Sequence, residues 1–278
     1  MVKIVTDTLS DIPDQLAEEL GISVVPLNVH FGTDTYRDRV DMSTERFYEM
    51  LQTSGVFPTT SAPPPGIFVE LFTKLAKETD EILAIMTSSK ISAIHESALQ
   101  AKNMVSLDCK IEVIDSLQVL AAQMFVVISA ARQAQSGAKL SQLSEKVKKD
   151  IPRSHVRGAL ATLEYLKKGG RIGKAQALLG SLLKVTPILS FVNGEAHPVT
   201  RVRSQAQAMD FIVDFVKGLP KVKELAVEDA TTPDKAEMLV DRLGDIFPKE
   251  RIYRTKISPV LGTHLGPGAL VLCAFEGE

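Results

Sequence analysis

The sequence predicts an α/β protein of two domains: an N-terminal domain with a mostly parallel sheet flanked by helices, and a C-terminal α+β domain with a mixed or antiparallel sheet. Short apolar strands alternate with amphipathic helices in the first half, and this order is typical of a parallel sheet covered on both faces. In the second half, Asn193-Gly194 separates two β-rich segments, which is the strongest short hairpin signal. A charged helical segment ends at Asp150 and Pro152 follows. We therefore expect domains at residues 1–152 and 153–278.

The first half gives the clearest periodicity. We expect strands at residues 3–6, 22–29, 81–86 and 110–114, because these are short apolar or β-branched runs. Helices are expected at residues 13–20, 43–51, 66–77, 92–105 and 118–134, and Ser43 is a suitable N-cap. The longest apolar run, residues 119–131, is interrupted by Gln123 and Ser129. Since a bilayer-spanning helix needs about 20 apolar residues, this run predicts a buried helix.

The second half mixes hairpin and helix signals. Strands are expected at residues 155–160, 187–191, 196–202, 224–227, 251–257 and 269–274, and helices near 163–168, 175–184, 206–217 and 235–243. A hairpin within such a pattern favours the mixed or antiparallel sheet of an α+β domain.

Composition and charge restrict the class of function. The chain has 278 residues, of which 45% are hydrophobic and 24% charged, the balance of a soluble globular protein. Its net charge of −2 gives no reason to expect binding to nucleic acid, and no more than transient contact with a membrane. Two cysteines cannot build a disulfide framework, and the N-terminus reads as a first strand rather than a signal peptide. We expect a cytoplasmic protein.

Three hydroxyl-rich segments follow predicted strands or open predicted helices: residues 6–11, 59–63 and 87–92. In open α/β sheets, ligands bind at the carboxyl ends of strands, so these segments are candidates for an anion site. Helix capping and turn formation explain the first segment better. In the second, Thr60 and Ser61 stand before a run of prolines, which fits either a rigid anion-binding loop or a helix start. Capping is also an alternative for Ser92 in the third, although hydroxyls recurring after successive strands indicate a site.

Two glycine-rich segments complete the set of candidates. Residues 167–174 resemble a phosphate loop but fail its G-x-x-x-x-G-K-[ST] pattern, because Gly169 lies one position too close to Gly173 and Ala175 replaces the hydroxyl. A turn carrying Arg171 is the simpler interpretation. Residues 262–268 hold His264 among glycines that allow close approach of a ligand. The other four histidines show no metal-ligand spacing, so neither a metal nor a cofactor is expected.

Four stretches in this order resemble the DegV family over essentially the whole chain. They begin at Ile4 (Ile-Val-Thr-Asp-Thr), Thr60 (Thr-Ser-Ala-Pro), Leu163 (Leu-Glu-Tyr-Leu-Lys-Lys-Gly-Gly-Arg-Ile-Gly-Lys-Ala) and Gly262 (Gly-Thr-His-Leu-Gly-Pro-Gly-Ala). The resemblance implies that a long-chain fatty acid is bound in a tunnel between two domains. It also implies that the chain is the lipid-carrying subunit of a fatty acid kinase system, which supplies acyl phosphate for phospholipid synthesis.

The same resemblance implies roles for six residues. Thr60, Ser92 and His264 match positions that bind the lipid carboxylate, and Ser61 adjoins Thr60. At the tunnel mouth, two arginines, Arg171 and Arg203, match positions that serve kinase docking or phosphoryl transfer. The sequence departs from the family pattern after residue 90, where Ile-Ser-Ala-Ile-His replaces the usual Leu-Ser-Gly-Thr-Tyr, and at the prolines that follow Ser61.

On this interpretation the chain is not an enzyme by itself, because no ATP site is recognisable in it and a partner kinase would hold the nucleotide. Two alternatives remain open. In the first, lipid occupancy changes binding to another protein, which makes the chain a regulator. In the second, Ser92 and His264 act as the catalytic residues of a hydrolase or phosphotransferase.

Overall fold

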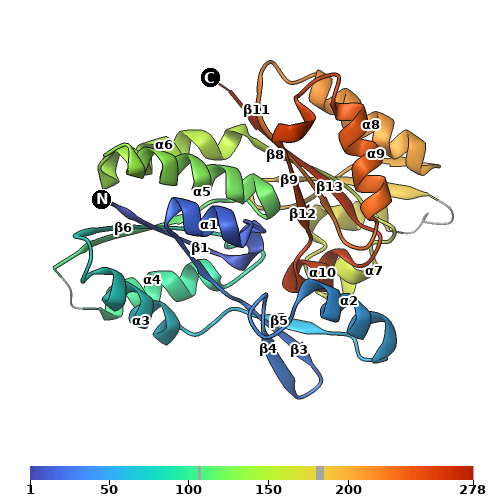
Figure 1. Cartoon of the computed structure of the whole chain (residues 1–278). Coiled ribbons are helices and arrows are strands. Elements are labelled where there is room, and N and C mark those ends of the chain that lie inside the picture. The colour runs from blue at the N-terminus through green and yellow to red at the C-terminus, as the bar shows by residue number, and fades with distance from the viewer. Residues whose placement is uncertain (106–107, 180–184, 278) are drawn as a thin grey trace.

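The computed structural model describes residues 1–105, 108–179 and 185–277. Its N-terminal half contains a four-stranded parallel sheet in the order β2-β1-β6-β7, which confirms the predicted parallel sheet. The strands are β1 (Lys3–Asp7), β2 (Ile22–Val25), β6 (Glu81–Met86) and β7 (Lys110–Asp115). Helices α3 (Pro65–Leu75) and α4 (Ile94–Met104) lie on one side of this sheet, and α1 (Asp14–Leu20), α5 (Leu120–Gln135) and α6 (Leu140–Asp150) lie on the other (Figure 1).

The C-terminal half contains a six-stranded mixed sheet in the order β10-β9-β8-β13-β11-β12, again as predicted. Its strands are β8 (Ser154–Ala159), β9 (Thr186–Val192), β10 (Glu195–Val202), β11 (Val222–Asp229), β12 (Ile252–Lys256) and β13 (Leu270–Glu276). Helices α8 (Gln205–Lys217) and α9 (Pro233–Leu243) cover its outer face (Figure 1). Between β9 and β10, Asn193 and Gly194 both adopt positive φ, 51° and 85°, as the predicted tight hairpin turn requires.

A small antiparallel sheet, β4-β3-β5, corrects one expectation. The expected strand at residues 22–29 is in fact two strands, because Pro26 cannot donate a ladder hydrogen bond. After it the chain leaves the parallel sheet and forms β3 (Asn28–Phe31), β4 (Asp34–Arg37) and, after α2 (Thr44–Thr53), β5 (Thr59–Ser61). The proline-rich segment is thus a strand followed by a helix start, with Pro64 at the N-cap of α3 and Pro65 in its first turn.

Two further expectations need correction. Residues 262–268 were expected to form a loop, but α10 (Pro259–Leu265) runs through the first part of them. Gly262 suits this helix because a Cβ there would lie 2.6 Å from the Phe47 ring and 2.7 Å from the Tyr48 hydroxyl, so the glycine permits close packing on α2. In place of the helix expected at residues 175–184, the structure has a 3₁₀ helix at Gly173–Leu178. Residues 180–184 lie outside the described part.

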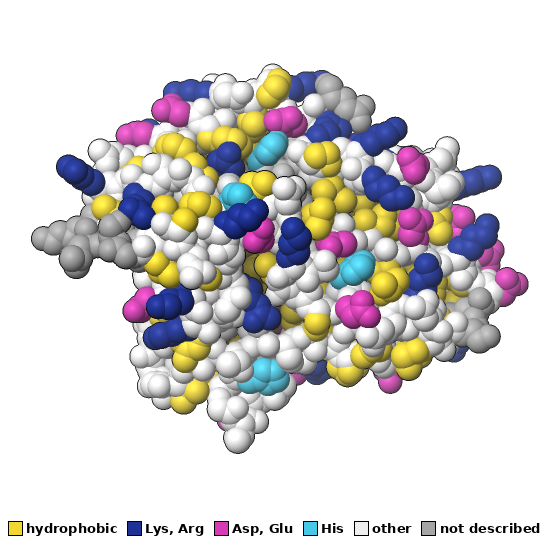
Figure 2. Space-filling model, turned by 180° about the vertical axis from the view of Figure 1, so that it is seen from behind, with side chains coloured by type: hydrophobic (Ala, Val, Ile, Leu, Met, Phe, Trp, Pro, Cys, Tyr) yellow, Lys and Arg dark blue, Asp and Glu magenta, His cyan; other side chains and the backbone are white. Residues whose placement is uncertain are grey.

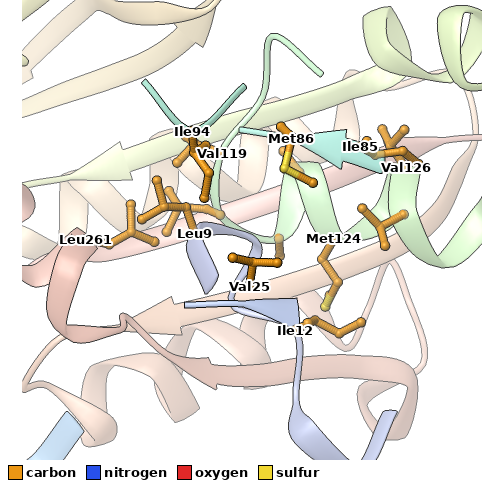
Figure 3. Packing of buried hydrophobic residues seen from close by; sticks show 14 of the residues in the cluster. Leu9, Ile12, Val25, Ile85, Met86, Ile94, Val119, Met124, Val126 and Leu261 are labelled. Carbon is orange, nitrogen blue, oxygen red and sulfur yellow. The ribbon is translucent and has the colours of Figure 1, made fainter. Parts of the chain in front are cut away.

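Helix α5 joins the two halves. It is buried along almost all its length, as its apolar run predicted, and it packs against β1 on one side and against β8 and β13 on the other. The larger hydrophobic cluster is therefore continuous across both halves: Leu9, Val119 and Leu261, which come from three distant segments, lie together in it (Figure 3). A second cluster lies between the six-stranded sheet and its two outer helices.

The strands of the six-stranded sheet all follow residue 153, and those of the other two sheets all precede residue 116. A 3₁₀ turn at Ile151–Arg153 precedes β8, and the short helix α7 (Glu164–Lys168) follows it. We retain the division into domains at residues 152 and 153 as a proposal. None of the helices in the described ranges has both the length and the apolarity needed to cross a bilayer.

Candidate functional site

A cavity of about 510 Å³ lies between the two halves and is lined mainly by apolar side chains. This volume falls within the usual range for small-molecule sites, roughly 300–1,000 Å³. The N-terminal half contributes Leu9, Leu27, Val119 and Leu120, and the C-terminal half contributes the inward face of the six-stranded sheet and α10. On β8, alternate residues face inward, so Val156 and Gly158 line the cavity while Arg157 projects to the other face.

The residues selected from the sequence reach the lining from four separate segments. Thr60 of β5, Ser92 after β6, Arg171 after α7 and His264 of α10 all border the cavity, and these are four of the six residues selected from the sequence. Thr60 Oγ1 lies 3.0 Å from His264 Nε2, a hydrogen bond between residues 204 positions apart. The structure therefore brings a hydroxyl of the small sheet and an imidazole of the C-terminal half together at one place.

His264 is a neutral group in this setting. Burial lowers the pKa of its imidazole to about 4, and the nearby Arg171 guanidinium adds to that effect. A neutral imidazole whose Nε2 donates to Thr60 leaves the threonine hydroxyl free to donate to a ligand. Its Nδ1 is buried without a partner among the described residues. The pair thus presents one hydrogen-bond donor, the Thr60 hydroxyl, and no fixed positive charge.

Arg171 is held at the cavity by two main-chain carbonyls. Its Nε donates to Ile91 at 3.0 Å and its Nη1 to Gly169 at 2.8 Å, which ties the turn after α7 to the loop after β6. Ser92 is the next residue in that loop, and its hydroxyl accepts the amide of Ile94 at 3.3 Å as α4 begins. The N-cap of α4 is Ala93, so Ser92 stabilises the turn before the helix rather than capping it. Its hydroxyl hydrogen remains available to a ligand.

Two of the selected residues are placed differently. Ser61 borders the cavity, but its hydroxyl lies 2.9 Å from His30 Nε2 on the outer face of the small sheet, away from Thr60. Arg203 is exposed just beyond the end of β10 and is not among the described residues that line the cavity. The structure does not bring Arg203 together with the other five.

The remaining hydroxyl-rich positions have structural partners. Asp7 is fully buried and accepts the amide of Leu9 at 3.0 Å, together with the amide and hydroxyl of Thr87 at 2.8 and 2.7 Å. This confirms the capping interpretation for the first segment. The Ser88 hydroxyl donates to the Gly194 carbonyl at 2.8 Å and so attaches the β9–β10 turn to the N-terminal half.

Gly169 is a site residue that sequence patterns did not single out for its contacts. A Cβ at this position would lie 2.2 Å from His264 Nδ1, so the absence of a side chain leaves room for the imidazole. We expect Gly169→Ala to displace His264 and break its hydrogen bond to Thr60, while α7 persists because φ at this residue is −76°. The imidazole resonances in an NMR spectrum would report the displacement, and Gly66→Ala, at an exposed position with open space around it and no positive φ, would be the control for a glycine-to-alanine change. An unshifted His264 signal in the Gly169 variant would contradict this account.

Fold and cavity together define an α/β protein with a mainly apolar cavity, bordered by a small group of uncharged polar side chains and one arginine. A family model described as "Uncharacterised protein, DegV family" matches residues 1–277. A DegV domain-containing protein from Caldanaerobacter subterraneus is 36% identical over 273 residues, covering 96% of each chain. Protein DegV of Bacillus subtilis is 34% identical over 281 residues, covering 98% of each chain. The chain belongs to the DegV family.

Solved structures agree in fold. A structure titled as fatty acid binding of a DegV family protein from Thermus thermophilus superposes with a TM-score of 0.92 at 28% identity and 99% coverage of each chain. DegV of Bacillus subtilis, described as a fatty acid binding protein, superposes with a TM-score of 0.90 at 32% identity and the same coverage.

Proposed function

We propose that this chain binds one long-chain fatty acid in the cavity and presents its carboxylate to a separate fatty acid kinase, which forms the acyl phosphate. The observation that carries this proposal is the cavity itself, a mainly apolar space that is bordered by Thr60, Ser92, His264 and Arg171. Two DegV relatives with the same fold are described as binding fatty acids, which supports the choice of ligand.

The energetics of such a complex favour tight holding of the tail. Burying an acyl chain contributes about 0.8 kcal/mol per methylene, so a chain of roughly sixteen carbons contributes on the order of 10 kcal/mol before ordering costs. The head group needs hydrogen bonds because an unpaired buried ion costs several kcal/mol. Thr60 and Ser92 supply hydroxyl donors, and the exposed side of Arg171 leaves the carboxylate reachable from outside.

The test of ligand identity is mass spectrometry of lipid released by denaturing the purified protein. We expect a stoichiometric fatty acid, or uptake of an added one by delipidated protein. A matched pair of variants, Thr60→Val and Thr60→Ser, separates the effect of losing the hydroxyl on fatty acid binding from the effect of changing the side-chain volume. Valine should weaken binding several-fold and serine should retain it. An empty wild-type protein that takes up no fatty acid would overturn the proposal.

Arg171 and Arg203 are proposed to serve the partner kinase. Arginine forks stabilise transferring phosphoryl groups and dock carboxylates, so replacing both with alanine should abolish acyl phosphate formation while fatty acid uptake persists. Because Arg203 lies outside the described cavity lining, its single variant should leave uptake unchanged. Parallel loss of uptake and phosphorylation in the double variant would contradict this separation of roles.

An enzyme using Ser92 and His264 has less support from the geometry. A nucleophile and its base need a direct hydrogen bond. In the described structure His264 Nε2 is engaged by Thr60, and the Ser92 hydroxyl is engaged by the amide that opens α4.

A further inference from the structure

The outer face of the six-stranded sheet, opposite the cavity, carries a row of three polar side chains beside α8. Arg157 of β8 pairs with Ser190 of β9, which pairs in turn with His197 of β10. Paired residues on neighbouring strands project to the same face, and strands lie about 4.8 Å apart. The small Ser190 therefore separates an arginine and a histidine whose Cα atoms are roughly 10 Å apart.

Arg157 is a partly desolvated cation without a carboxylate partner in the described part of the chain. Its guanidinium carbon lies 3.8 Å from the centre of the Phe215 ring, and its Nη1 donates to the Val156 carbonyl at 2.8 Å. Its Nε is buried and has no partner among the described atoms. Burial lowers the pKa of this guanidinium. Stacking on Phe215 uses the face of the group and the Val156 carbonyl uses Nη1, so the donors that remain for an oxyanion are those of Nε and Nη2.

The histidine of the row also has unused hydrogen-bonding capacity. His197 Nε2 is buried without a partner in the ranges that the structure describes, and Ser190 between the two larger side chains is buried. Carboxylates that border the row are engaged elsewhere. Glu276 lies 3.0 Å from His155 Nε2, and Glu195 lies 3.3 Å from Lys174 Nζ.

We propose that Arg157, Ser190 and His197 form a second anion site, separate from the fatty acid cavity, for a phosphate group. A guanidinium edge, a hydroxyl and an imidazole arranged in a row offer donors to several oxygens of a tetrahedral anion, and charge-assisted bonds of this kind are the strong ones. The phosphate belongs either to the free inorganic ion or to a lipid head group. Arg157 and His197 are not among the described residues that line the cavity, whereas Ser190 borders it, so the variants that test the phosphate site change only Arg157 and His197.

The structure offers a matched control for the test. Arg254 of β12 belongs to the same row across the same sheet, through Leu272 and Val227, but its Nε lies 2.9 Å from Glu237. Inorganic phosphate would be titrated into the full chain and followed by ³¹P NMR. We expect millimolar binding that Arg157→Gln weakens at least tenfold, His197→Gln weakens a few-fold and Arg254→Gln leaves unchanged. Fatty acid uptake by each variant would verify its fold.

Co-sedimentation with vesicles identifies the source of the phosphate. Phosphatidylcholine vesicles with and without phosphatidic acid would be compared, using wild type and Arg157→Gln. Binding that requires both phosphatidic acid and Arg157 assigns a lipid head group, whereas phosphate binding without vesicle binding assigns the free ion. Absence of both in the wild type, or equal losses in Arg157→Gln and Arg254→Gln, would overturn the proposal and leave the carrier function unaffected.

Discussion

Replacing Gly158 with leucine is expected to weaken binding of a long-chain fatty acid by roughly a hundredfold. A Cβ at this position would meet Val271 Cγ2 at 3.5 Å and Leu160 Cδ2 at 4.0 Å, both ordinary contacts with cavity-lining residues. The added isobutyl group therefore fits the wall and extends into the ligand space. If it displaces about four methylenes, the loss is about 3 kcal/mol.

The same substitution should discriminate by chain length. Isothermal titration calorimetry with fatty acids of increasing length would show the largest loss of affinity for the longest acids, because the shortest can bind without contacting the new side chain. Gly158→Ala is the matched control and should change affinity little. Wild-type affinity of Gly158→Leu for the long acids would show that the acyl chain lies elsewhere.

Stability is expected to fall as pH rises from about 4 towards 7 and beyond, because of buried carboxyls where the two halves meet. Burial raises the pKa of Asp11 and of Asp38 to about 7, and it raises that of Glu228 well above its usual value. Asp11 and Glu228 come from opposite halves, and the negative charge of Asp11 adds to the effect of burial on the pKa of Glu228. Main-chain amides of Ala121 and Ser258 bind the pair at 2.6 and 3.4 Å.

The direction of this pH dependence follows from the number of protons that the folded and unfolded states bind. Unfolded carboxyls lose their protons near pH 4, whereas these folded ones keep theirs to about pH 7, so the native state binds more protons in between. Each such group lowers the free energy of unfolding by up to about 1.4 kcal/mol per pH unit over that window. Their stabilising contribution is complete below pH 4 and is lost as pH rises through 7.

Asp38→Asn separates this effect from general acid sensitivity. The amide cannot ionise, so at pH 8 the variant should be more stable than the wild type by on the order of 2 kcal/mol, with near equality at pH 5. Urea unfolding at both pH values measures this. The control is Asp41→Asn. Arg37 holds the pKa of that exposed carboxyl at about 2, so loss of the carboxylate should change the free energy of unfolding only slightly and should not stabilise the protein at pH 8. A wild-type protein that is most stable at pH 8 would contradict the account.

The sequence predicted the two principal sheets because their strands are short apolar runs with helices at regular spacing between them. It missed the change of sheet at Pro26, since Ile22 to Val29 reads as one continuous β-rich run and only tertiary pairing separates β2 from β3. It also missed α10, whose glycine is tolerated in a helix because Phe47 and Tyr48 occupy the space of its side chain.

Part of the site was also predictable from local sequence. Thr60, Ser92, Arg171 and His264 stand in distinctive local sequences, and the structure brings them to one cavity. The apolar wall was not predictable: Leu9, Leu120 and Val271 look like any core residue, and only the meeting of the two halves makes them a lining. The Asp11–Glu228 pair had no local signal, because its partners lie far apart in sequence and their burial arises from packing.

Strand order in the six-stranded sheet has a consequence for biosynthesis. Strand β13 lies between β8 and β11, yet the ribosome makes it after both. Until it emerges, the β8–β9–β10 meander and the β11–β12 pair have no strand to join them, and Val271 is missing from the cavity wall. Long-range pairing of this kind is slow. The cavity wall is therefore complete only after this strand has been synthesised, and a nascent chain stalled before it would expose the apolar lining to chaperones.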